Sequence, residues 1–227
     1  MFNPRFLLIA LCGLSAACAL VQPGAAVPPP AARGDAGFVA VVTRIDQRTA
    51  QQMRGVSWRR GCPVPIRDLR TIRMTHRGFD RKVHWGRLVV HEDVARRVVR
   101  VFRKMYAAGF PIRRMHRIER YNGNDNRSMA ADNTSAFNCR SVTGSPGRFS
   151  VHSYGKAIDI NTIENPYVNG RTVLPAAGRR YLDRSNVRRG MIVRGRVVTR
   201  AFRRAGFDWG GNWRSLKDYQ HFEIPRR

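Results

Sequence analysis

Two short segments of this 227-residue chain carry the residue types that hydrolytic metal sites use. The first contains His152 and Asp159, and the second, near the C-terminus, contains Asp218, His221 and Glu223. Two imidazoles and one carboxylate form a ligand set for one Zn²⁺ that leaves the fourth position for water, as in catalytic rather than structural zinc sites. Asp218 would then accept a proton from the attacking water, and Glu223 would support a ligand imidazole from behind.

The first segment has the pattern of a strand preceded by a turn. Residues alternate over 157–161, so a strand would bury Ile158 and Ile160 and present Asp159 on the opposite face. Gly155 would allow the chain to turn and bring His152 back over Asp159. The sequence thus predicts that these two polar side chains meet.

The second segment alternates in the same way. Phe222 and Ile224 would face the core, which leaves His221 and Glu223 on the other face. Spacing alone leaves a structural role open, because a single histidine beside a strand is more often a hydrogen-bonded core or surface residue than a metal ligand.

The rest of the body indicates an α+β domain in which a central antiparallel sheet carries the site and helices lie on one side. Three helices are expected, over 91–108, 128–137 and 199–205. Expected strands cover 88–90, 112–118, 157–161, 191–198 and 220–224, with a hairpin tip at Arg194 and Gly195. No strand is followed by a glycine-rich phosphate loop and a helix, so a nucleotide-binding doubly wound fold is not expected.

The chain is strongly basic. It has 42 Lys and Arg against 15 Asp and Glu, for a net charge of +27, and only Lys82, Lys104, Lys156 and Lys217 are lysines. Arginine binds phosphate and carboxylate groups bidentately, which leaves nucleic acid, an acidic membrane surface and anionic cell-wall polymers open as partners. The hydrophobic content of 43% excludes a disordered basic tail as a description of the whole chain.

The N-terminus has the pattern of an export signal. Arg5 is followed by an apolar run over 6–14 and by small residues, so we expect a signal peptide over 1–20, with cleavage as late as 26. A flexible linker is expected over 21–36 and the folded domain over 37–227. Lipid attachment at Cys18 is a less favoured alternative. A secreted or envelope-associated monomer without a transmembrane helix in its mature form is the expectation.

Cys62 and Cys139 are the two cysteines left outside the predicted leader. In an exported chain they can close one disulfide across a long loop, so we predict the Cys62–Cys139 bridge. The alternative is a pair of buried free thiols.

Both polar segments resemble the signature of the zinc D-alanyl-D-alanine carboxypeptidase family, which includes vancomycin-resistance-type dipeptidases and L-alanyl-D-glutamate endopeptidases. The signature is Ser-x-His, six residues and Asp, followed later by an acidic residue, two residues and His, matched by Ser150 to Asp159 and by Asp218 to His221. The resemblance extends over about 55–225, through Gly61-Cys62-Pro63, His84-Trp85-Gly86, Asn133 to Arg140, Asn165-Pro166-Tyr167 and Trp209-Gly210-Gly211-Asn212-Trp213.

This resemblance implies a DD-peptidase/hedgehog-like fold and a peptidase that cuts peptidoglycan stem peptides, in the first place as a D-alanyl-D-alanine carboxypeptidase. It implies His152, Asp159 and His221 as the zinc ligands and Asp218 as the general base. It also implies a substrate-binding or oxyanion-stabilising arginine, for which Arg140 is the first candidate and Arg127 the second, and a substrate-binding or orienting role for Ser150.

Three alternatives remain open. One is an L-alanyl-D-glutamate-type wall endopeptidase, and another is a non-catalytic basic protein that binds cell wall or nucleic acid. Specific nucleic-acid binding is not expected, because the arginines are scattered without a basic helix or an aromatic ladder. A serine peptidase is suggested by Ser153 and Lys156, but no lysine is followed by the Thr-Gly that such enzymes need.

Overall fold

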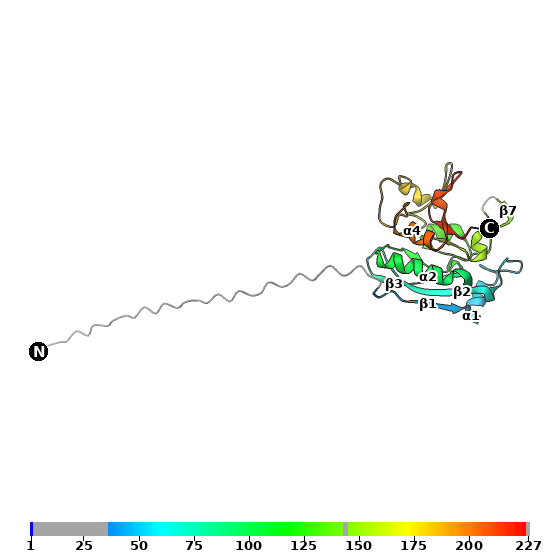
Figure 1. Cartoon of the computed structure of the whole chain (residues 1–227), viewed down its shortest axis with the longest axis horizontal. Helices are drawn as coiled ribbons and strands as arrows, with labels where there is room; N and C mark the ends of the chain where they lie inside the picture. The colour runs from blue at the N-terminus through cyan, green and yellow to red at the C-terminus, as the bar shows by residue number, and fades with distance from the viewer. Residues whose placement is uncertain (2–35, 143–144, 226–227) are drawn as a thin grey trace. The chain divides into compact units, whose positions relative to one another are not determined.

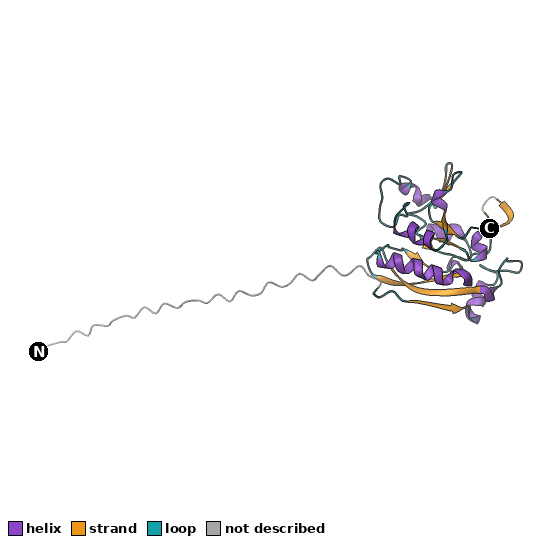
Figure 2. Cartoon of the chain, in the orientation of Figure 1, coloured by secondary structure: helices purple, strands orange, loops and turns teal. Residues whose placement is uncertain are grey.

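The largest sheet is a three-stranded antiparallel meander formed by β1 (Ala40–Arg44), β2 (Leu69–Arg77) and β3 (Val83–His91) (Figures 1 and 2). Alternate residues of a strand point to opposite faces, so one face of this sheet is apolar. The buried side chains of that face are Ile72, Met74, Leu88 and Val90. The strand expected over 88–90 is therefore the end of a longer strand, and β1 and β2 were not predicted.

The computed structural model describes residue 1, residues 36–142 and residues 145–225. The predicted signal peptide and linker, apart from residues 1 and 36, lie outside the described residues. In the part of the chain that is described, no helix has the length and apolar character needed to cross a membrane.

Helix α2 (Glu92–Ala107) covers the apolar face of the meander and confirms the helix expected over 91–108. The His91 side chain caps its N-terminus by accepting a hydrogen bond from the Asp93 backbone N–H at 3.2 Å. An apolar stripe of the helix packs into the core, with Val94, Val98, Val101, Phe102 and Met105 buried.

Of the two other predicted helices, one is confirmed and the other is mostly wrong. Helix α4 (Val197–Arg204) confirms the helix expected over 199–205 within two residues at its start. The helix expected over 128–137 is wrong in most of its length, because α3 spans Asp125–Ala130. Asn124 rather than Ser128 caps α3, and Asp132 then has a positive φ of 54°, which stops the helix.

The strand expected over 191–198 is also wrong. The turn at Arg194 and Gly195 is present, but it leads into α4 instead of a second strand. The strand expected over 112–118 is reduced to the two residues of β4 (Arg114–Met115), which pairs in parallel with β5 (Asn133–Thr134).

A single central sheet is not present among the described residues; the expectation is corrected to several small sheets. Besides the meander there is a sheet in the order β11-β13-β8 and another in the order β10-β9-β12. Their strands are β8 (Ala157–Asp159), β9 (Tyr167–Asn169), β10 (Thr172–Leu174), β11 (Asp208–Trp209), β12 (Lys217–Asp218) and β13 (His221–Glu223). Strands of two or three residues form only short hydrogen-bonded ladders. Turns and short 3-10 helices therefore make up much of the chain between β8 and β13.

Those remaining short elements are the helix α1, the hairpin of β6 and β7, and five 3-10 turns. They span α1 (Gln47–Met53), β6 (Ser141–Val142), β7 (Ser145–Phe149), η1 (Ile66–Asp68), η2 (Ile118–Tyr121), η3 (Val151–Tyr154), η4 (Ala176–Tyr181) and η5 (Gly210–Asn212).

The predicted Cys62–Cys139 disulfide is present. Cys139 lies in a second, smaller core cluster that also contains Met53, Leu69 and Phe137. The backbone N–H of Cys139 donates to the Ser57 carbonyl at 2.8 Å. The bridge therefore fixes the segment that leads into Arg140, beside the candidate site.

Candidate active site

His152 lies on the 3-10 turn η3, which two neighbouring residues define. The Ser150 side chain caps the turn by accepting a hydrogen bond from the His152 backbone N–H at 3.3 Å. Gly155 ends it with a φ of 65°, and a Cβ there would lie 2.6 Å from the His91 backbone nitrogen. Only glycine fits both conditions. The expected turn at Gly155 is present, and it places His152 beside strand β8.

Strands β8 and β13 bring the other two residues together. The two strands are antiparallel neighbours in which His221 lies opposite Asp159 and Phe222 lies opposite Ile158. Ile158 is 1% exposed and Phe222 is completely buried, so the opposite faces of both strands belong to the core. The predicted alternation in both segments is confirmed, and it places His221 and Asp159 on one face.

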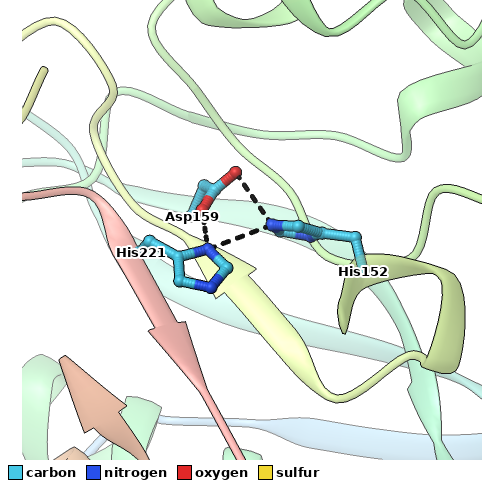
Figure 3. Close-up of side chains that lie close together, drawn as sticks. All are labelled: His152, Asp159 and His221. Atoms are coloured by element: carbon cyan, nitrogen blue, oxygen red, sulfur yellow. Dashed lines mark hydrogen bonds and ion pairs between the residues drawn. The ribbon is translucent and has the colours of Figure 1, made fainter. Parts of the chain in front are cut away.

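The three side chains converge on one point (Figure 3). His152 Nε2 lies 3.2 Å from Asp159 Oδ2 and 3.2 Å from His221 Nδ1, and His221 Nδ1 lies 3.0 Å from Asp159 Oδ1. One ligand atom from each residue lies within 4.8 Å of the others. A possible metal-binding triad is therefore present.

Hydrogen bonds behind the two imidazoles decide which nitrogens face the centre. His152 Nδ1 donates to the Ala136 carbonyl at 2.6 Å, and His221 Nε2 donates to Glu223 Oε2 at 3.0 Å. In neutral rings, His152 Nε2 and His221 Nδ1 then carry lone pairs, and they face each other and a carboxylate. A set of acceptors this close requires a positive charge between them, so the donor set fits a cation such as Zn²⁺.

The electrostatics of the site agree with that requirement. Burial by itself would raise the pKa of Asp159, but the two histidines outweigh it and hold that pKa far below its ordinary range. Burial would lower the pKa of His221, but hydrogen bonds to Asp159 and Glu223 raise it to about 10. The centre therefore attracts one positive charge, either a proton or a metal ion.

Asp218 lies on β12 near this centre. Burial raises the pKa of its carboxyl to about 6; the charge of His221 favours the ionised form and the charge of Asp159 opposes it. Asp218 Oδ1 is buried and makes no hydrogen bond within the described part of the chain. A Cβ on Gly210 would lie 2.7 Å from the Asp218 carbonyl oxygen, so a glycine is needed for the close approach of η5.

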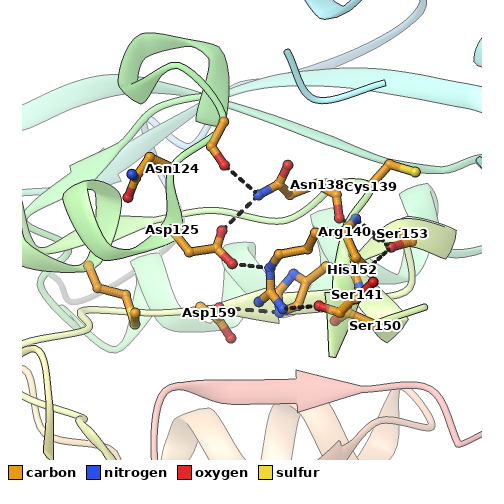
Figure 4. A network of polar contacts seen from close by, with 12 residues as sticks. Asn124, Asp125, Asn138, Cys139, Arg140, Ser141, Ser150, His152, Ser153 and Asp159 are labelled. Carbon is orange, nitrogen blue, oxygen red and sulfur yellow. Dashed lines mark hydrogen bonds and ion pairs between the residues drawn. The ribbon is translucent and has the colours of Figure 1, made fainter. Parts of the chain in front are cut away.

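Arg140 lies beside the turn that carries His152 (Figure 4). Its backbone N–H donates to Ser153 Oγ at 2.9 Å, and its carbonyl accepts from the Ser150 backbone N–H at 3.0 Å. Its guanidinium forms an ion pair with Asp125, which also accepts a hydrogen bond from Asn138 Nδ2 at 2.8 Å. The first arginine candidate is thus held next to the site by a carboxylate that the sequence did not point to.

The other two predicted substrate-binding residues occupy different places. Ser150 is 7% exposed and uses its hydroxyl to cap η3. Arg127 lies on α3, where its backbone N–H donates to Asn124 Oδ1 at 3.0 Å. Ser150 therefore helps to position His152, whereas the backbone of Arg127 is held by the cap of its own helix.

Two groups that contact the triad histidines were not predicted as site residues from the sequence. The Trp213 ring lies 5.4 Å from the His221 ring, and the Ala136 carbonyl fixes the His152 tautomer. Trp213 stands in the Trp209-Gly210-Gly211-Asn212-Trp213 motif, which was the one available signal. Asp125 and the Ala136 carbonyl had none, since a backbone oxygen and a distant acidic residue leave no local pattern.

Comparison with known proteins agrees with the motif. No solved structure matches this chain. A family model described as D-alanyl-D-alanine carboxypeptidase matches residues 143–224, the segment that contains His152, Asp159, Asp218 and His221. Over this segment the chain carries the signature of the D-alanyl-D-alanine carboxypeptidase family, which confirms the resemblance and indicates a peptidase.

Proposed function

We propose that this protein is an exported zinc-dependent peptidase that releases the terminal D-alanine of peptidoglycan stem peptides. One observation carries the proposal. Two imidazoles whose tautomers are fixed by hydrogen bonds and one carboxylate converge on one point, and the buried Asp218 carboxylate, whose pKa is raised, lies beside them. Structural zinc sites are closed by four protein ligands, whereas three ligands and a nearby base are typical of hydrolytic sites.

His152 Nε2, an oxygen of Asp159 and His221 Nδ1 would hold the metal. A Zn²⁺ ion bound there supplies a Lewis acid that polarises the scissile carbonyl and makes water a better nucleophile near pH 7. Ala136 and Glu223 hold the two imidazoles in the required tautomers. These contacts keep the ligand atoms in place before the metal binds, which lowers the cost of forming the site.

Asp218 is proposed as the general base. A carboxyl with a pKa of about 6 is mostly ionised at neutral pH and still accepts a proton readily. Its Oδ1 would take the proton from the attacking water and then deliver it to the amine that leaves as D-alanine. The absence of another hydrogen-bond partner for Oδ1 in the described structure supports this role.

Arg140 is proposed to bind the free carboxylate at the end of the substrate. A guanidinium pairs bidentately with a carboxylate, so this contact would favour substrates that end at the site over longer peptides. Asp125 already holds the Arg140 side chain and would keep it aimed while its remaining N–H groups meet the substrate. Ser150 is proposed to orient the site through its cap on η3, and Arg127 remains the second arginine candidate.

The test is an assay with the mature protein and a soluble stem pentapeptide. We expect release of D-alanine, loss of that release with a chelator, and recovery when Zn²⁺ is added back. Release of an internal fragment instead of D-alanine would replace the carboxypeptidase with an endopeptidase. Intact pentapeptide from protein that contains zinc would contradict the proposed substrate, and activity blocked by penicillin but not by a chelator would favour a serine enzyme.

A further inference from the structure

The outer face of the large meander is only half covered. At one end, Leu69 and Val89 pack into the small core cluster around the disulfide. At the other end, Arg73, Trp85 and Arg87 are exposed on the same face, since β2 and β3 pair in a register that places odd-numbered residues together. This exposed half is called the outer groove here.

The outer groove contains a charge arrangement that is unfavourable by itself. Arg73 lies directly opposite Arg87 across the two strands, and like charges in that position destabilise a sheet. Arg73 places its guanidinium over the Trp85 ring at 3.9 Å, and Trp85 is 45% exposed. Among the described residues, neither arginine forms an ion pair with a carboxylate. Two unpaired cations and an exposed indole on a rigid sheet are the features of a binding surface rather than of a stability device.

The groove has walls and a volume. It encloses about 720 Å³ between the sheet and the segment 115–122, with Gln52 and Val56 from the region of α1 at one side. That segment adds Arg117 and Arg120, and the one acidic residue of the lining, Glu119, is already bonded to Ser57 and paired with Arg117. The lining therefore keeps a net positive charge after its internal pairs are made.

We propose that the outer groove binds an acidic glycan, a chain of sugar rings that bear carboxylate groups. Arginine forks match carboxylates, the indole offers an apolar surface to the faces of sugar rings, and the rim amides suit hydroxyl groups. Single-stranded nucleic acid fits less well, because it stacks successive bases on a series of aromatic rings, whereas the described lining offers the Trp85 indole and the His116 imidazole only.

The groove is continuous with the segment that holds the active-site arginine. Asn122 lines the groove, and the next residue, Gly123, accepts a hydrogen bond from Asn138 Nδ2 at 3.1 Å. The same Asn138 amide donates to Asp125, the partner of Arg140. A glycan held in the groove would thus lie along the part of the molecule that leads to the candidate site. The choice of a wall glycan rests on the proposed function, whereas the groove itself does not.

The test measures binding of the mature protein to glycan strands that an amidase has stripped of peptide, which leaves a free carboxylate on each disaccharide. Arg73→Gln combined with Arg87→Gln, and separately Trp85→Ala, should each weaken binding by about tenfold, the size expected for losing charged contacts. The matched control is Arg200→Gln with Arg203→Gln, two exposed arginines of α4, and it should change the Kd by less than about twofold. A neutral chitin oligosaccharide should bind about tenfold more weakly than the stripped strands.

Two further readouts separate the possible failures. Because it removes a like-charge pair, the Arg73→Gln, Arg87→Gln variant should keep or raise the Tm, so weakened binding cannot be ascribed to unfolding. Its hydrolysis of soluble pentapeptide should stay unchanged, which keeps this test separate from that of the peptidase. Equal weakening in the α4 control, unchanged binding in both groove variants, or tighter binding of polyphosphate or oligothymidylate would overturn the proposal.

Discussion

Two buried acidic clusters in this protein show how neighbours decide what burial does to a carboxylate. In the candidate active site, Asp159 lies between His152 and His221. In the second cluster, Asp132 and Glu164 are 3% and 1% exposed, and their nearest cation is the half-exposed Arg113, 3.4 Å and 3.6 Å away. Both clusters are largely buried, but only the first surrounds its carboxylate with imidazoles.

The pKa values of the two clusters move in opposite directions. The histidines outweigh burial and lower the pKa of Asp159, whereas burial and the nearby Asp132 raise the pKa of Glu164 to about 8. Glu164 Oε2 has no hydrogen-bond partner among the described residues, and its other oxygen accepts from Tyr181 at 3.4 Å. The first cluster is therefore suited to a cation and the second to a retained proton.

The largest effect is expected from removing an imidazole of the first cluster. His221→Ala should abolish zinc binding and lower kcat/KM by at least about 10⁴-fold, because both the Lewis acid and the activated water are lost. Metal content and D-alanine release measure the two effects. His84→Ala, an exposed histidine paired with Asp80, is the matched control and should leave both unchanged. Full activity of His221→Ala would remove it from the ligand set.

A smaller effect that spares the metal is expected at Asp218. Asp218→Asn keeps the shape of the side chain but cannot accept the proton, so zinc should stay bound while kcat falls by about 10² to 10⁴-fold. Asp208→Asn, an exposed carboxylate on β11, should behave like the parent. Loss of zinc in Asp218→Asn would make it a ligand, and unchanged kcat would exclude it as the base.

A still smaller effect, on zinc affinity, is expected at Glu223, which accepts a hydrogen bond from the ligand His221. Glu223→Gln should weaken zinc affinity by about 10 to 100-fold, because the amide can still accept a hydrogen bond from His221 Nε2 but no longer carries the negative charge. A zinc titration with a competing chelator measures this change. Affinity unchanged in Glu223→Gln but lost in Glu223→Ala would show that the hydrogen bond, not the charge, is what the imidazole requires.

The smallest effect is expected in the second cluster, where it concerns stability. The pKa of Glu164 is raised in the folded state, so its contribution to stability is complete below about 4.5 and is lost as the pH rises through about 8. Glu164→Gln should therefore raise the Tm by about 2 °C or more at pH 9 but not at pH 5. Thermal melts across this range, with the exposed Glu92→Gln as control, check it. If Glu164→Gln melted at a lower temperature than the parent at pH 9, Glu164 would not retain a proton in the folded state.

The first cluster, in the candidate active site, was predictable because its residues lie in two regular local patterns. Alternation around Ile158 and Phe222 placed Asp159 and His221 on the polar faces of strands, and Gly155 marked the turn that returns His152. The pairing of those strands, which sets His221 opposite Asp159, was supported by the family motif rather than by the alternation alone.

The second cluster and several elements were not predictable in this way. Asp132 and Glu164 meet through the tertiary fold, with no spacing rule that connects them. Ser128 resembles a helix cap, but the Asn124 side chain makes the cap and Asp132 ends the helix. The single central sheet failed as an expectation because several strands of two or three residues pair only locally and separate small sheets result.

The most direct test of the difference between the two clusters is the metal content of the purified protein. After equilibration with Zn²⁺ and removal of the excess, elemental analysis should find one zinc per chain, and none in the Asp159→Asn, His221→Ala variant. The Asp132→Asn, Glu164→Gln variant should still contain one zinc, since that cluster holds a proton. No zinc in the parent chain, or one zinc in the first variant, would contradict the assignment of His152, Asp159 and His221 as a metal site.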